Sequence, residues 1–235
     1  MSYFESRIKV NINDFDDIIV RIKFYEKLGI NNIILEPKNN IERISSSLRK
    51  IIKEESRINI FFRNNLKLNN IEEFKRRIKK YSNFSDIISV ESLNREVQLQ
   101  SARDSRVDIV SFSDPEIIKT LTPGVISLTK QNNTFIEFSL ASIMVRNKGI
   151  QSKNFRNLYK FTQLALKLKA NFIISGNFIH LFDYRHPRAL IAVCHSLLGI
   201  PMNFAKKAFI QNPKKLVEKT QKIFETKFKQ GVKLI

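Results

Sequence analysis

Short apolar, β-branched runs recur along the chain, and each is followed by a segment whose apolar residues have helical spacing. Most runs begin about 25 residues after the one before, which is the length of one strand, one loop and one helix. The seven predicted strands cover residues 8–12, 32–35, 58–62, 86–90, 108–112, 135–140 and 171–175. Several are apolar on both faces, as in Ile33-Ile34-Leu35, which is typical of parallel strands buried between helices.

The predicted helices have recognisable ends. Asp14 is a candidate N-cap of the first helix, and Gly29 follows the end of that helix. Apolar residues spaced three and four apart predict further helices over residues 41–52, 155–168 and 188–198.

Seven strand–helix units in 235 residues predict an α/β fold, a single (β/α) TIM-like barrel with about seven clear parallel strands and one short or irregular strand. A doubly wound open sheet is the alternative, because periodicity does not show closure of a sheet. We expect one domain over residues 1–235 with extra C-terminal helices. Within it, residues 201–235 carry nine Lys and two Glu and are expected to form a basic helical flank.

The charge balance favours an anionic partner. Lys and Arg number 41 against 22 Asp and Glu, a formal net charge of +19 at pH 7. Such an excess attracts nucleic acid or an anionic membrane surface. The chain is also rich in Ile, Asn and Lys, as expected from an AT-rich genome, and this bias raises the Lys count without any function. Part of the excess is therefore consistent with ordinary solvated surface.

Targeting signals are missing from the sequence. The first residues have no basic region followed by an apolar run, and no stretch approaches the roughly 18 apolar residues that span a bilayer. The single Cys excludes an internal disulfide and fits a reducing compartment. We expect a cytoplasmic protein without a membrane partner.

The predicted barrel mouth is poor in catalytic groups. In such barrels the chemistry lies in the loops that follow the strands, and the first 179 residues contain no His. The chain also lacks GxGxxG, GxxxxGK[ST] and GxSxG motifs. We predict no catalytic residue and no bound metal. Glu36, Glu91 and Asp114 lie at separate strand ends and leave a weak Mg²⁺ site, hence a metal-dependent phosphoesterase, as an alternative. A different barrel enzyme or a tRNA-modifying protein is a third possibility.

Two residues next to each other in the chain resemble a nucleophile–base pair only in sequence. Cys194 and His195 would point about 100° apart on a helix, so they cannot form a dyad. Cys194 shares a helix face with Leu190, Leu197 and Leu198, which predicts a small core hydrophobe.

Arg residues carry more information about phosphate binding than scattered Lys, because the guanidinium fork matches phosphate geometry. Three Arg lie on or beside the helix before the fifth strand, and two flank His186-Pro187 at a helix start, where main-chain N–H groups also favour anions. The others lie at strand ends or in a basic run, and for all of them a plain solvated face is the alternative. The candidate RNA-binding residues are Lys38, Arg63, Arg77, Arg95, Arg103, Arg106, Arg185 and Arg188.

Four stretches resemble, in order, the motifs of one family. They are VDIVSF at 107–112 followed by DPE at 114–116, FIEFS at 135–139, ISGN at 174–177, and RHPR at 185–188 with LGIP at 198–201 and NPKKLVE at 212–218. Together they are similar to the ribonuclease P protein component 3 family. Asn177 stands where the family usually has Ala, and Ala189 where an acidic residue is common. The first hundred residues match more loosely, chiefly at Phe61-Phe62-Arg63.

The resemblance implies a barrel related to the polymerase-and-histidinol-phosphatase metal phosphoesterases but without their metal ligands. It also implies the partners: ribonuclease P RNA, the component 2 protein, other ribonuclease P proteins, and precursor tRNA through the complex. The holoenzyme is an endoribonuclease that removes the 5′ leader of precursor tRNA, with Mg²⁺ held by the RNA. This chain would bind and stabilise the RNA, need no cofactor and perform no chemistry itself.

Overall fold

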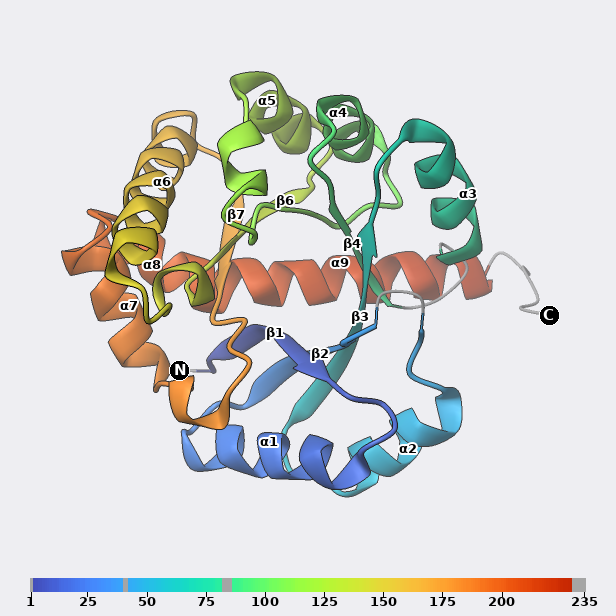
Figure 1. Cartoon of the computed structure of the whole chain (residues 1–235). Coiled ribbons are helices and arrows are strands. Elements are labelled where there is room, and N and C mark those ends of the chain that lie inside the picture. Colours follow the sequence, from blue (N-terminus) through green and yellow to red (C-terminus); the bar gives the residue numbers. More distant parts are fainter. Residues whose placement is uncertain (1, 40–41, 82–85, 230–235) are drawn as a thin grey trace.

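The computed structural model describes residues 2–39, 42–81 and 86–229, with side chains described up to residue 222 (Figure 1). The strands are β1 (Phe4–Val10), β2 (Asn32–Pro37), β3 (Asn59–Lys67), β4 (Ile87–Glu91), β5 (Ile109–Ser111), β6 (Phe135–Ser139) and β7 (Phe172–Ser175). The helices are α1 (Phe15–Lys27), α2 (Ser46–Glu54), α3 (Ile71–Tyr81), α4 (Arg95–Arg103), α5 (Pro123–Gln131), α6 (Lys148–Lys167), α7 (Pro187–Ser196), α8 (Met202–Lys206) and α9 (Asn212–Lys229).

The strands are parallel, and their order in the sheet follows their order in the sequence from β1 to β7. A doubly wound sheet reverses its order at a switch point, so this topology excludes the open-sheet alternative. Seven strands in the described residues form a nearly closed barrel with helices around it, which confirms the predicted fold (Figure 1). At the seam between β1 and β7, the Glu5 carboxylate accepts a hydrogen bond from the Gly176 main-chain N–H at 3.0 Å.

Two predicted helix boundaries are confirmed and two are shifted. Asp14 caps α1 by accepting a hydrogen bond from the Asp17 N–H at 2.9 Å, and Gly29 follows with a φ of 72°. In contrast, α2 starts at Ser46, because the Ser45 side chain caps it, and the predicted start at residue 41 lies outside the described residues. Likewise, α6 starts before residue 155, because Asn147 caps a polar first turn that has no apolar periodicity.

Strand β1 begins earlier than predicted. The prediction started at residue 8 because Glu5, Arg7 and Lys9 interrupt the apolar pattern. In the structure a register shift lies between Glu5 and Ile8, and Glu5 lies at the seam with β7. Beyond the shift, Arg7 and Lys9 alternate with Ile8 and Val10, which face the helices, as the two-residue period of a strand requires. The side chains of Arg7 and Lys9 therefore lie inside the barrel.

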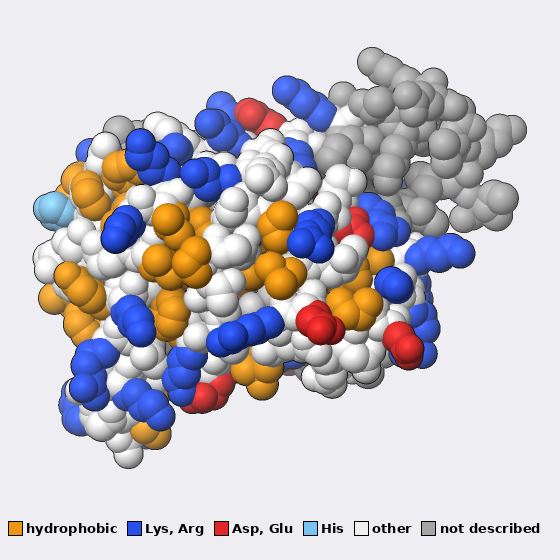
Figure 2. Space-filling model, turned by 90° about the horizontal axis from the view of Figure 1, so that it is seen from above, with side chains coloured by type: hydrophobic (Ala, Val, Ile, Leu, Met, Phe, Trp, Pro, Cys, Tyr) orange, Lys and Arg blue, Asp and Glu red, His pale blue; other side chains and the backbone are white. Residues whose placement is uncertain are grey.

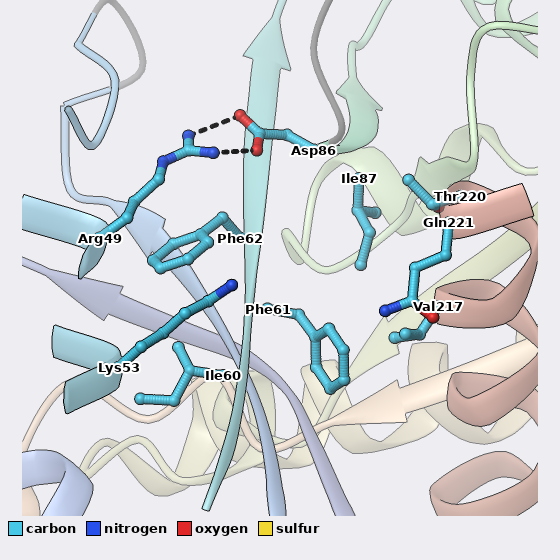
Figure 3. A pocket seen from close by; sticks show the side chains of 10 residues that line it. All are labelled: Arg49, Lys53, Ile60, Phe61, Phe62, Asp86, Ile87, Val217, Thr220 and Gln221. Carbon is cyan, nitrogen blue, oxygen red and sulfur yellow. Dashed lines mark hydrogen bonds and ion pairs between the residues drawn. The ribbon is translucent and has the colours of Figure 1, made fainter. Parts of the chain in front are cut away.

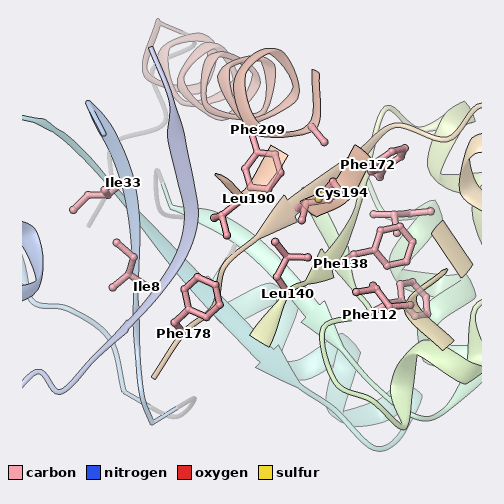
Figure 4. Close-up of a cluster of buried hydrophobic side chains, with 14 of the residues drawn as sticks. Ile8, Ile33, Phe112, Phe138, Leu140, Phe172, Phe178, Leu190, Cys194 and Phe209 are labelled. Atoms are coloured by element: carbon pink, nitrogen blue, oxygen red, sulfur yellow. The ribbon is translucent and has the colours of Figure 1, made fainter. Parts of the chain in front are cut away.

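The apolar core fills the space between the strands and the surrounding helices (Figure 4). Ile8 and Ile33 extend from β1 and β2, and Phe138 and Phe172 from β6 and β7. Cys194 on α7 is fully buried, and burial raises the pKa of its thiol to about 12, so it behaves as the predicted core hydrophobe.

A second apolar layer lies inside the barrel at the N-terminal ends of the strands, and α9 covers it. Figure 1 shows α9 running across the ring of strands. Leu216 and Val217 of α9 belong to one cluster with apolar inward-facing residues near the starts of the strands, which are Phe4, Ile34, Phe61, Ile87, Ile109, Phe135 and Ile173. The predicted C-terminal helices are confirmed over residues 202–229, and α9 also closes one end of the barrel.

Candidate nucleic-acid interface

The interior of the barrel above its apolar layer contains a buried network of ion pairs. Arg63 donates to both carboxylate oxygens of Glu137, with Nη1–Oε1 at 2.7 Å and Nη2–Oε2 at 2.6 Å. Arg7 Nε lies 2.9 Å from Glu36 Oε1, and its terminal nitrogens lie 3.4 Å from Glu91 and Glu137. Two guanidinium groups thus connect carboxylates from three other strands.

The opposite charges of the Arg and Glu side chains in this network largely neutralise one another. Burial opposes ionisation of Glu91, but Arg7 and hydrogen bonds from Asn65 and Ser113 outweigh it and lower the pKa of Glu91 to about 2. For Arg7, burial again disfavours the charge, yet the carboxylates of Glu36 and Glu137 raise its pKa above the usual value. Arg7 and Glu91 are therefore both charged at neutral pH.

Glu5 is the exception in the interior. Burial raises the pKa of its carboxyl to about 8, although main-chain N–H groups of Arg7 and Gly176 favour the charged form. Its position at the seam is tight, because a Cβ added to Gly176 would lie 2.6 Å from Glu5 Oε2. Glu5 therefore joins the two edge strands mainly as a neutral acid near pH 7.

Two of the three carboxylates that the sequence analysis left as a possible Mg²⁺ site belong to these ion pairs. Glu36 and Glu91 are both held by Arg7, and Asp114 is exposed and caps the turn that follows it, accepting the Glu116 N–H at 2.8 Å. Across the part of the chain that the structure describes, no group of three or more His, Cys, Asp or Glu is arranged to hold a metal ion.

Arg63 was expected at a strand end where a phosphate reaches it, and the structure corrects this. Its side chain has no solvent exposure, and all its nitrogens point into the barrel toward Glu137, Glu36 and Ser89. The reason is the pleat of β3, which directs Arg63 and Asn65 inward. Arg63 holds the fold and is out of reach of RNA.

Helix α4 presents two arginines to solvent. Arg95 and Arg103 are its first and last residues, and both are exposed without an ion-pair partner among the described residues. Arg106, predicted on the same face, lies beyond the helix end and forms two hydrogen bonds with Asp104, at 2.8 and 2.6 Å. Two of these three cations are therefore available to an anion, and the third is shared with a carboxylate.

The start of α7 presents the other pair. Arg188 is exposed, whereas the Arg185 guanidinium donates to the carbonyls of Phe182 and Tyr184. The ring of His186 accepts the Arg188 N–H at 3.1 Å and so caps the helix. The side chains of Arg185 and Arg188, more than the helix end itself, are available for phosphate.

The loop before α7 is held firmly against α1. Tyr184 stacks on Tyr25 with ring centroids 4.5 Å apart, and Arg21 donates to the Tyr184 hydroxyl at 2.7 Å and to the Ile179 carbonyl at 2.9 Å. A fixed loop positions Arg185 without an ordering cost when a ligand binds.

Sequence reasoning missed an aromatic residue on this loop. Phe182 is 91% exposed, and Ile179 close to it in sequence is 58% exposed. Exposed aromatic rings next to Arg are the groups on which RNA bases stack. The available signal was an apolar run in a loop that follows a strand end.

The remaining candidates differ in their surroundings. Lys38 is exposed just after β2. Arg77 on α3 lies 3.7 Å from Glu73 and donates to the Lys67 carbonyl at 3.2 Å. Figure 2, seen from the side of α4 and α5, shows Lys and Arg spread over this face with few Asp and Glu between them.

Known proteins resemble the chain in sequence and in fold. It is 23% identical over 142 residues to ribonuclease P protein component 3 of Methanococcoides burtonii. The matched region covers 60% of this chain and 58% of that protein, so the chain spans little more than half the length of this curated relative.

Two solved structures have a similar fold. An archaeal ribonuclease P, determined with mature tRNA, has a chain that is 16% identical, with a TM-score of 0.73 over 94% of this chain and 93% of that one. A. niger ochratoxinase is 10% identical, with a TM-score of 0.57 over 92% of this chain and 71% of that one. Identities this low show a shared fold and no more.

The family assignment rests on the sequence as a whole. A family model described as RNase P subunit p30 matches residues 3–223, which is nearly all of the described chain, and agrees with the motifs found at 107–218. This chain belongs to the RNase P subunit p30 family.

Proposed function

We propose that this chain is a protein subunit of ribonuclease P, the endoribonuclease that removes the 5′ leader of precursor tRNA, and that it binds and stabilises the catalytic RNA. The observation that carries the proposal is the family match over residues 3–223. The similar fold in an archaeal ribonuclease P and the net charge of +19 support it.

Exposed arginines supply the RNA contacts in this proposal. Arg95 and Arg103 on α4, with Arg185 and Arg188 at α7, present guanidinium groups to solvent from rigid elements, and Lys38 adds a charge after β2. Each phosphate neutralised releases a counterion, which favours binding without any base-specific contact.

The chain itself carries no reacting group in this proposal. The carboxylates of Glu36, Glu91 and Glu137 inside the barrel are ion-paired with Arg7 and Arg63, which occupy the space that a metal ion would need. The Mg²⁺ ions of the reaction are held by the RNA. The chain works in the cytoplasm with the component 2 protein and other ribonuclease P proteins, as one barrel domain with a basic C-terminal flank.

Reconstitution tests the proposal directly. Ribonuclease P RNA is assembled with its partner proteins, with and without this chain, and cleavage of precursor tRNA is followed over a range of Mg²⁺ concentrations. We expect omission of the chain to slow cleavage and to raise the Mg²⁺ requirement, because the proteins neutralise RNA phosphates. Unchanged rates at every Mg²⁺ concentration would contradict the proposal.

A second measurement tests the non-catalytic part. The purified chain is incubated with phosphoester substrates and Mn²⁺ or Zn²⁺, and we expect no turnover above that of the Glu36→Gln and Glu91→Gln variants or of the metal alone. Turnover that depends on Glu36 and Glu91 would support a metal-dependent phosphoesterase instead.

A further inference from the structure

A cleft opens between α2, the first residues of β3 and α9, at the barrel end opposite the mouth (Figure 3). It has a cavity volume of about 230 Å³. Pockets that enclose a whole small molecule start near ~300 Å³, so this cleft fits one planar group of a larger ligand better than a free cofactor.

An aromatic ring forms the wall of the cleft. Phe61 is half-buried and is backed by Phe4, whose ring stacks on it with centroids 6.3 Å apart and planes at 23°. Ile60 and Val217 add apolar surface on either side. Because Phe4 supports the back of the ring, the front of Phe61 is a fixed surface on which another ring can stack.

Gln221 from α9 and Lys53 from α2 extend toward Phe61 from opposite sides (Figure 3). Gln221 on α9 is exposed, and its amide has no hydrogen-bond partner among the described residues. An amide offers one donor and one acceptor side by side, which is the pattern that matches the edge of a nucleobase. A purely apolar partner would leave this amide unsatisfied.

The charge of the cleft favours an anionic ligand. Lys53 is exposed, and among the described residues no carboxylate pairs with it; its ammonium lies 5.6 Å from the centre of the Phe62 ring. The acidic residue of the lining, Asp86, is neutralised by Arg49, which donates to both its oxygens, and by Arg43 at 3.1 Å. The lining therefore carries a net positive charge.

We propose that this cleft binds one unpaired base of an RNA strand, stacked on Phe61, with Gln221 at the base edge and Lys53 at the adjoining phosphate. This inference rests on the proposed RNA-binding function and adds a single-stranded element to it. Stacking on an aromatic ring with a nearby cation is the usual way in which proteins hold unpaired nucleotides.

The test compares single-stranded with duplex RNA. The full chain is titrated with fluorescent ten-nucleotide oligo(A) and oligo(U), and with a ten-base-pair RNA duplex, by fluorescence anisotropy. The variants are Phe61→Leu, which keeps apolar volume but removes the ring face, Gln221→Ala and Lys53→Ala. Lys23→Ala is the matched control, because Lys23 is also an exposed helical Lys without an ion pair among the described residues, and it lies outside the cleft.

We expect Phe61→Leu to weaken binding of single strands roughly five-fold or more, with duplex binding unchanged. Gln221→Ala, at an exposed position that does not affect folding, should weaken it about two- to ten-fold and change the preference between oligo(A) and oligo(U). Lys53→Ala should lower the salt slope for single strands by about 0.7, whereas Lys23→Ala should leave it unchanged.

The outcomes separate this proposal from the proposed function. If Phe61→Leu and Gln221→Ala bind single strands like the unmodified chain while loss of Arg95, Arg103 and Arg188 weakens RNA binding, the cleft proposal fails and the RNA-binding function stands. The same result is expected if a side chain of a partner protein fills the cleft. If the chain binds neither single strands nor duplex, both fail. Crosslinks from 4-thiouridine in the oligonucleotide should map to residues 59–62 or 217–222, and crosslinks confined to the loop around Phe182 would also overturn the proposal.

Discussion

The interior of the barrel and the outer face of the molecule use arginine in opposite ways. Arg7 and Arg63 have no solvent exposure and are surrounded by carboxylates, whereas Arg95, Arg103 and Arg188 lie in solvent without an acidic partner among the described residues. An arginine paired inside the protein fixes strands relative to one another. An arginine left unpaired outside contributes little to folding and is available to a polyanion.

The comparison predicts that interior and surface substitutions separate stability from binding. Arg7→Ala should have the largest effect on stability, because it removes one of the two buried guanidinium groups that neutralise Glu36, Glu91 and Glu137 and leaves Arg63 bonded to only two of these carboxylates. We expect the free energy of unfolding in urea to fall by about 3–5 kcal/mol. Arg103→Ala, the matched surface change, should alter it by less than about 0.5 kcal/mol. Equal losses for both variants would remove the distinction.

Glu5 tests whether the interior depends on balanced charge. Its folded pKa of about 8 is above the ordinary value of 4.5 for a Glu in an unfolded chain, so the folded state binds the proton more tightly. The resulting stability is fully present below about pH 4.5 and is lost as the pH rises through about 8. Glu5→Gln keeps the neutral form. Between pH 5 and 9 the free energy of unfolding of this variant should therefore fall by about 1–3 kcal/mol less than that of the unmodified chain. Parallel curves of unfolding free energy against pH would contradict this.

The surface arginines should affect RNA binding with almost no change in stability. In Arg95→Ala/Arg103→Ala/Arg188→Ala, the slope of log Kobs against log salt for ribonuclease P RNA should fall by about 0.7–0.9 for each phosphate contact removed. The melting temperature should stay within a few degrees. A control triple variant at Lys23, Lys27 and Arg57 removes the same charge from other exposed positions and should leave the slope nearly unchanged. An equal decrease in the salt slope of both triple variants would mean that RNA binding depends on net charge alone.

The smallest expected effect distinguishes a paired from an unpaired surface arginine. Arg106 is bonded to Asp104, so Arg106→Ala should lower the salt slope less than Arg103→Ala does, since the pair offers little net charge to RNA. Its effect on stability should stay below about 1 kcal/mol, as for other exposed pairs. Asp104→Ala is the reciprocal control. It frees Arg106 and should raise the slope, and no rise would show that Arg106 faces away from the RNA.

The sequence predicted the order of strands and helices well, because apolar runs and caps such as Asp14 are local signals. It failed where charge lies inside the barrel. Glu5, Arg7 and Lys9 hid the start of β1, and Arg63 was expected at the surface, because a charged strand residue is usually exposed. Arg7 and Lys9 alternate with Ile8 and Val10, and this period of two fits a strand whose charged face points into a barrel. The cleft at Phe61 was not predictable, since it depends on where α9 packs against β3.

The position of α9 has a consequence for how the chain folds during its synthesis. Each strand pairs with the one made just before it, so successive units can dock as they leave the ribosome. The apolar layer at the barrel floor, however, stays open until Leu216 and Val217 arrive. A nascent chain stopped before residue 212 would therefore expose Ile109, Phe135 and Ile173 to solvent, and would be the species that chaperones must bind.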